Sequence, residues 1–167
     1  MKRVFSMILL LVFATPAAAY STYTIGGLFS AVFPGAPSFT GELGAGKEKS
    51  RGYAYTDEEN YIFFSATYQV NKNHYRKNEV GKQLRNFVNG QKAIGRVTSF
   101  RYKKIKGCEG VTFSLDVPYQ GEIIRKFSVV CYKDGRFLSW SVQEIVNFSK
   151  LSAKFLFDKY LPRFSLT

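Results

Sequence analysis

The sequence predicts an α+β protein in which an antiparallel β-sheet is packed by helices. Several segments alternate apolar and polar residues and are joined by short turns, as paired strands do. One segment between them and one near the end carry apolar residues at helical spacing. Runs of hairpins separated and followed by a helix favour this architecture. The length of 167 residues and the hydrophobic fraction of 46% fit one globular domain.

The first nineteen residues resemble a secretory signal. Lys2 and Arg3 precede the apolar run Met7–Phe13, which leads to the small residues Ala17, Ala18 and Ala19. This run is shorter than the roughly 20 apolar residues that cross a bilayer. We therefore expect cleavage after Ala19, a single domain over residues 20–167, and a periplasmic or secreted bacterial protein without a transmembrane anchor. Tyr20 follows the cut, and only a cysteine there would support lipid attachment.

Strands are predicted first in the N-terminal half. Residues 29–34 alternate and stop at Pro34-Gly35, so they predict a strand. Residues 36–50 are polar and rich in glycine, which indicates a loop. Residues 51–55 and 60–70 then predict a hairpin that turns at residues 56–59.

A helix is predicted at residues 78–89, followed by a meander of four strands. The inward face of the helix would carry Val80, Leu84, Phe87 and Val88, and Gly90 would end it. The four strands are expected at residues 93–105, 109–117, 122–132 and 136–143, with Lys133-Asp134-Gly135 turning the last pair. A final helix at residues 147–160 would turn Phe148, Leu151 and Phe155 inward and end at Pro162.

The two cysteines are expected to form a disulfide. An even number of cysteines in an exported chain favours a bridge. If the second and third strands of the meander are symmetric about a turn at residues 118–121, Val117 faces Glu122 and Cys108 faces Cys131. A redox switch is the alternative, but neither cysteine lies in a CxxC pair.

This order of elements resembles the PsbP-like superfamily. The resemblance rests on the opening Phe33-Pro34-Gly35-Ala36-Pro37, on Gly107-Cys108-Glu109-Gly110 before a strand, and on the ending Phe164-Ser165-Leu166. It covers most of residues 28–167 and implies an α-β-α sandwich. It also implies a non-catalytic accessory or binding protein, with no catalytic motif and no cofactor to transfer. Nothing in the sequence matches a photosystem-docking segment, so that role is not transferred.

Positive charge is concentrated in one part of the chain. The formal net charge is +12, and residues 72–106 hold eleven cations against the single acid Glu79. The cations are Lys72, Arg76, Lys77, Lys82, Arg85, Lys92, Arg96, Arg101, Lys103, Lys104 and Lys106. Acidic and basic residues balance in the rest of the predicted mature chain. The imbalance therefore falls on the predicted helix and the strand that follows it.

This basic segment suggests an anionic partner. A localised positive surface concentrates anions and speeds their encounter in a salt-dependent way. We expect docking to an anionic membrane surface or an acidic protein through Lys82, Arg85, Arg101, Lys103 and Lys104. A solubilising charged face is the simplest alternative. Nucleic acid is a third, favoured by nearby aromatic residues, but export argues against it.

A second function class is a small-molecule binder with a pocket between sheet and helix. Leu138, Trp140 and Val142 share one strand face, which predicts a core stripe beneath a helix. The alternative places Trp140 in the wall of a ligand pocket.

Catalytic and metal-binding motifs are incomplete. Residues 41–47 fit GxxxxGK, but Glu48 stands where a phosphate-binding loop needs Ser or Thr. His74 is the single histidine, so a histidine-based metal site is not expected. Asp57, Glu58 and Glu59 lack the spacing of a calcium loop and suit a charged turn. We therefore expect no enzyme, metal or cofactor; a periplasmic hydrolase is the weakest of the alternatives.

Overall fold

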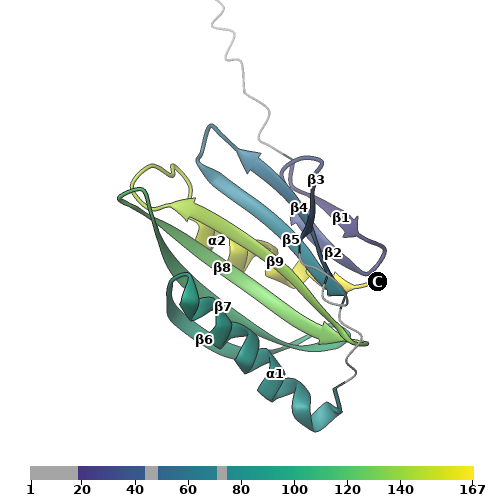
Figure 1. The fold of residues 1–167 in the computed structure, drawn as a ribbon. Helices are drawn as coiled ribbons and strands as arrows, with labels where there is room; N and C mark the ends of the chain where they lie inside the picture. The colour runs from purple at the N-terminus through teal and green to yellow at the C-terminus, as the bar shows by residue number, and fades with distance from the viewer. Residues whose placement is uncertain (1–18, 44–48, 71–74) are drawn as a thin grey trace, which may run out of the picture.

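A computed structural model describes residues 19–43, 49–70 and 75–167. The predicted signal segment lies outside these residues except for Ala19. The main element is a seven-stranded antiparallel sheet in the order β3-β4-β5-β9-β8-β7-β6 (Figure 1). Its strands are β3 (Ser38–Leu43), β4 (Lys49–Asp57), β5 (Ile62–Val70), β6 (Arg96–Ile105), β7 (Cys108–Tyr119), β8 (Glu122–Lys133) and β9 (Arg136–Ile145).

The two faces of this sheet are covered by different elements (Figure 1). Helix α1 (Lys77–Gly90) packs against β7 and β8 on one face. Helix α2 (Ala153–Tyr160) and a three-stranded sheet cover the opposite face. The small sheet has the order β1-β2-β10, formed by β1 (Ser21–Ile25), β2 (Phe29–Phe33) and β10 (Ser165–Leu166). The α+β class and the placement of helices on both faces are confirmed.

Helix α1 forms nearly where its periodicity predicts. Val80, Leu84 and Val88 are buried, and Phe87 is half-buried beside them. The Glu79 carboxylate accepts a hydrogen bond of 2.9 Å from the backbone N–H of Arg76, which caps the first turn. The α-helix ends at Gly90, as predicted. The backbone of Gly90 has the right-handed helical conformation, with φ −60°. The chain then continues into a 3₁₀ turn at Gln91–Ala93.

The meander confirms the predicted strands but corrects one turn. Asp134 and Gly135 have φ values of 49° and 78° and form the expected tight turn. The predicted turn at residues 118–121 is too long. Gln120 and Gly121, at φ 50° and 84°, make a two-residue turn, and Tyr119 pairs with Glu122. Pro118 fits within β7 because the pairing of β6 with β7 ends at Asp116.

This shorter turn changes the geometry of the cysteine pair. Cys131 lies opposite Gly110, so Cys108 is its diagonal neighbour. The disulfide between Cys108 and Cys131 is present, with the two Cα atoms 6.1 Å apart. Diagonal positions on one sheet face are close enough for a bridge. The predicted bond is therefore correct, although the predicted register is wrong by two residues.

The expectation of a loop over residues 36–50 is wrong in part. Residues 38–43 form β3, an edge strand that pairs with β4. An exposed edge strand often lacks the alternation of apolar and polar residues by which strands are predicted. Strand β3 is mostly polar, and a bulge between Phe39 and Gly41 interrupts its pairing. Residues 44–48, and with them much of the phosphate-loop-like segment, lie outside the described residues. Strands β1 and β10 were not predicted.

The last helix begins later than predicted and turns a different face inward. Ser152 caps it by accepting a hydrogen bond of 3.3 Å from the backbone N–H of Phe155. Phe148, Leu151 and Phe155, predicted to point inward, are 52%, 40% and 62% exposed. The residues that α2 buries are Ala153, Leu156, Phe157 and Tyr160. The chain then continues past Tyr160 into a 3₁₀ turn, Leu161–Arg163, that contains Pro162.

Candidate functional site: the basic edge of the sheet

Strand β6 is the last strand of the large sheet, beside helix α1. Among the described residues, no strand pairs with the outer edge of β6. Helix α1, the following turn and β6 lie along one side of the molecule, at the lower left of Figure 1, and they carry most of the cations of the basic segment. We call this group the basic edge: Lys77, Lys82, Arg85, Lys92, Arg96, Arg101, Lys103 and Lys104.

The five cations predicted from the sequence are all exposed, but they project in different directions. Side chains alternate along a strand. Lys104 therefore lies on the α1 side of β6, together with Tyr102, while Arg101 and Lys103 lie on the opposite side. The predicted set surrounds the edge of the sheet and does not form one flat face.

Tyr102 links the helix to the edge strand. The Arg85 Nε donates a hydrogen bond of 3.2 Å to the Tyr102 hydroxyl, which in turn donates to the Gly81 carbonyl at 3.1 Å. The Arg85 guanidinium also lies 5.8 Å from the centre of the Tyr102 ring. These contacts place Arg85 above β6 and hold its side chain near the edge.

Little negative charge neutralises the basic edge. Among the described residues, neither Lys82 nor Arg85 forms an ion pair, and neither do Arg101, Lys103 and Lys104. The exception in the group is Arg96, whose Nη2 lies 3.6 Å from the Asp116 carboxylate. The other cations keep their positive charge available to an external anion.

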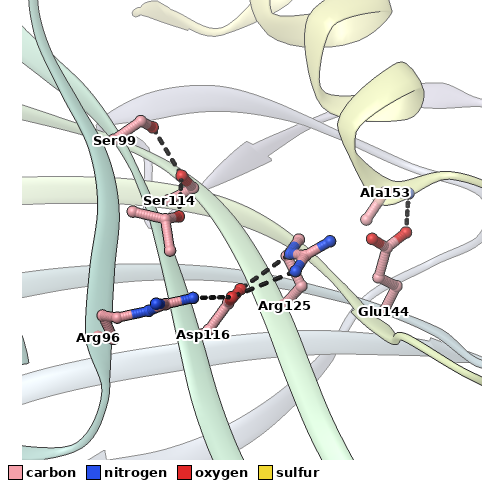
Figure 2. Close-up of polar contacts among 8 residues, drawn as sticks. Arg96, Ser99, Ser114, Asp116, Arg125, Glu144 and Ala153 are labelled. Atoms are coloured by element: carbon pink, nitrogen blue, oxygen red, sulfur yellow. Dashed lines mark hydrogen bonds and ion pairs between the residues drawn. The ribbon is translucent and has the colours of Figure 1, made fainter.

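The carboxylate of Asp116 is bonded to side chains of neighbouring strands (Figure 2). Asp116 is buried in β7 and accepts hydrogen bonds of 2.8 and 3.2 Å from the Arg125 guanidinium on β8. The hydrogen bond from Arg125 lowers the pKa of Asp116, and Arg96 adds a smaller effect in the same direction. Nearby, the Glu144 carboxylate accepts a hydrogen bond of 2.7 Å from the Ala153 N–H at the start of α2. Both acids therefore have structural partners.

A hollow of about 740 Å³ adjoins the basic edge near the start of α1. Four lysines line it: Lys77, Lys103, Lys104 and Lys133. Tyr75, Tyr102 and Tyr132 supply aromatic walls, and the acids in the lining are Glu109 and Asp134. The hollow thus combines cations with aromatic hydroxyls, a lining suited to phosphate or carboxylate groups.

Lys133 and Tyr132 were missed by sequence reasoning, whereas Tyr75 and Tyr102 were among the aromatic residues noted near the cations. Lys133 lies 27 residues beyond the basic segment in the sequence. It lies at the β8–β9 turn, which the fold brings next to the lysines of the hollow. Tyr75 meets Tyr132 because its backbone N–H donates to the Tyr132 hydroxyl at 2.8 Å. The sequence gives no signal for these contacts, which depend on the order of strands in the sheet. Lys72 and His74 lie outside the described residues.

Trp140 does not line a pocket. Its side chain is completely buried on the face opposite α1. The indole N–H donates a hydrogen bond of 3.0 Å to the Val32 carbonyl, and its ring stacks on Phe157 of α2 at 5.5 Å between centroids. The core-stripe prediction is confirmed, and the alternative of Trp140 as a ligand platform is wrong.

The acidic turn at residues 57–59 has a structural explanation. The Asp57 carboxylate accepts hydrogen bonds of 3.3 and 2.9 Å from the backbone and side-chain nitrogens of Asn60. These contacts close the β4–β5 turn. Within residues 19–43, 49–70 and 75–167, no three His, Cys, Asp or Glu side chains form a group that could hold a metal ion.

The fold is an antiparallel sheet with a helix on each face, and it was compared with known proteins. No family model matches the chain, and no curated protein sequence matches it. Among solved structures, the solution structure of the cyanobacterial PsbP protein CyanoP from Synechocystis sp. is similar, with a TM-score of 0.49 and 11% identity. The match covers 92% of this chain and 96% of that one.

A second similar structure is the crystal structure of PA94 from Pseudomonas aeruginosa, a protein of unknown function. Its TM-score is 0.46 at 10% identity, and the match covers 75% of this chain and 83% of that one. In the described part of the chain, no helix is both long and apolar enough to cross a bilayer. The disulfide is compatible with an exported protein.

Proposed function

We propose that this chain is an exported, non-catalytic binding protein of the bacterial envelope that docks an anionic lipid surface through its basic edge. The observation that carries the proposal is the group of exposed cations around β6, among which Arg96 alone forms an ion pair within the described residues. An ordinary solubilising surface mixes both signs of charge, whereas Glu79 is the single acid among residues 75–106.

The surroundings of the cations favour lipid over an acidic protein. Tyr102 is half exposed on β6, and Ile94 is exposed in the turn that leads from α1 to β6. Tyrosine suits a membrane interface because its ring is apolar and its hydroxyl is polar. The lysine-lined hollow offers room for a headgroup phosphate next to Tyr102. The predicted signal segment and the disulfide support action outside the cytoplasm.

Co-sedimentation with vesicles tests this proposal. Residues 20–167 would be mixed with phosphatidylglycerol-containing or purely phosphatidylcholine vesicles at about 0.02 and 0.15 M salt. We expect binding to the anionic vesicles only, weaker at the higher salt but still measurable. Each surface cation contributes about 1 kcal/mol to such binding, so changing Arg101, Lys103 and Lys104 to Ser lowers affinity about 100-fold.

A matched variant separates site-specific docking from net charge. Lys150, Lys154 and Lys159 lie on the far side of the sheet, near and on α2, and are exposed. Changing these three to Ser removes the same charge, and it is expected to lower affinity by much less. Equal losses in both triple variants, or no binding at the higher salt, would reduce the basic edge to a solubilising surface. Lysines on an edge strand also prevent edge-to-edge aggregation, and that role would then suffice.

A further inference from the structure

The face of the large sheet that carries α1 changes character beyond the helix. Under α1 it is apolar, formed by residues such as Val111, Phe113 and Leu115. Farther along, the same face presents hydroxyl groups from three strands: Thr67 on β5, Ser128 on β8, and Ser139 and Ser141 on β9. Ser128 and Ser141 are buried. Buried hydroxyls have a desolvation cost that apolar residues at the same positions would avoid.

These hydroxyls form the floor of a cavity of about 340 Å³ between the sheet and the C-terminal end of α1. We call it the hydroxyl cavity. Phe87 from α1, Phe113 from β7 and Phe137 from β9 form apolar walls. This volume lies at the lower end of the range for ligand pockets.

The hydroxyls are paired with one another in a way that leaves donors available. Ser128 Oγ lies 2.9 Å from Ser141 Oγ, and Thr67 Oγ1 lies 2.5 Å from Ser139 Oγ. In each pair one O–H donates to the other oxygen. The hydrogen of the accepting hydroxyl is not used by that bond. Two pairs therefore supply two O–H donors within the cavity.

Lys126 adds a cation to the same lining. It precedes Ser128 by two residues on β8, so both side chains lie on one face, between Leu115 and Gln143 of the adjacent strands. Within the described ranges no carboxylate forms an ion pair with Lys126, and the lining contains no acid. Burial lowers the pKa of Lys126, because the charged ammonium loses water there. An anion in the cavity would replace that lost solvation.

We propose that the hydroxyl cavity binds a small organic carboxylate with an apolar body. The carboxylate accepts a charge-assisted hydrogen bond from Lys126 and hydrogen bonds from the serine and threonine hydroxyls. The apolar body packs against Phe87, Phe113 and Phe137. This site is distinct from the basic edge. It is also distinct from the pocket beside Trp140 that the sequence left as an alternative, since Trp140 faces the other side of the sheet.

Binding of simple acids and their amides tests the proposal. The purified protein would be titrated with benzoate, 3-phenylpropionate and hexanoate, and with the matching neutral amides, by calorimetry and ligand-observed NMR. We expect millimolar or tighter binding of at least one acid and at least tenfold weaker binding of its amide. This comparison uses the wild-type protein, so its result does not depend on how a variant folds.

Variants then locate the bound acid. Lys126→Met keeps the length of the side chain and removes the charge, and we expect at least a tenfold loss of affinity. Lys150→Met, a change at an exposed lysine outside both the cavity and the basic edge, is the matched control and leaves acid binding unchanged. A cavity that holds only water predicts no acid binding. That outcome overturns the proposal, as do equal affinities for acid and amide or unchanged binding in Lys126→Met. None of these outcomes bears on vesicle docking, which depends on other residues.

Discussion

Asp116 joins three strands at the level of single side chains. Its carboxylate is buried, accepts two hydrogen bonds from Arg125 on β8, and lies near Arg96 on β6. Because the folded pKa of Asp116 is lowered, its pairing stabilises the protein above the pKa of the unfolded chain, near 4. This contribution is lost as the pH falls through the folded pKa.

Asp116→Asn is expected to lower the free energy of unfolding by about 1–3 kcal/mol at pH 7, because Arg125 loses its charged partner. The figure is modest because Arg125 is partly exposed. Chemical denaturation at pH 7 and at about pH 2.5 measures this effect. The difference between wild type and variant shrinks at the lower pH.

Asp158→Asn is the matched control. Asp158 pairs with Lys154 one helical turn away on the exposed surface of α2. Its loss should change stability by less than about 0.5 kcal/mol. A deficit in Asp116→Asn that stays constant down to pH 2.5 contradicts the role given to the carboxylate charge.

At the scale of elements, helix α2 shows where sequence periodicity misleads. Phe148, Leu151 and Phe155 follow a helical spacing, yet they are exposed. The helix begins only after Ser152, because Ser152 and the Glu144 carboxylate both cap its first N–H groups. Glu144 lies on β9, so its contribution to the cap could not be predicted from local sequence.

The corrected face of α2 gives a direct prediction. Phe157 is buried against Trp140, while Phe155 is mostly exposed. Phe157→Ala is expected to destabilise the protein by about 3–5 kcal/mol, as large-to-small changes in a core do. Phe155→Ala, two positions away, should cost less than about 1 kcal/mol. Thermal unfolding of both variants checks the assignment, and the reverse order of stability would mean that the helix turns its predicted face inward.

Elements with strong local signals were predictable, and those held by distant partners were not. Helix α1 and strands β6–β9 have clear periodicity and short turns, so their ranges follow from the sequence. Strand β10 is two residues long and is defined by its pairing with β2, more than 130 residues earlier. The basic segment could also be predicted. Its placement around a sheet edge, and the addition of Lys133, depend on strand order.

At the scale of the whole molecule, charge and packing are divided between different regions. The face that bears α2 and the small sheet is apolar and closed over Trp140. Positive charge is concentrated at the β6 edge. The hydroxyl cavity lies on the other face of the sheet, the one that bears α1. A second exposed group, formed by Tyr61, Val146, Phe148, Leu151 and Phe155, is apolar. Docking through the basic edge and docking through these apolar residues would therefore perturb the backbone amide groups of different regions.

Amide chemical-shift mapping with lipid nanodiscs distinguishes these surfaces and tests the central claim most directly. With anionic nanodiscs, we expect the largest shifts and broadening in α1, β6 and the turn that holds Lys133. We expect little change with neutral nanodiscs. Perturbations centred on residues 146–155, or equal effects from neutral and anionic lipid, would contradict docking through the basic edge.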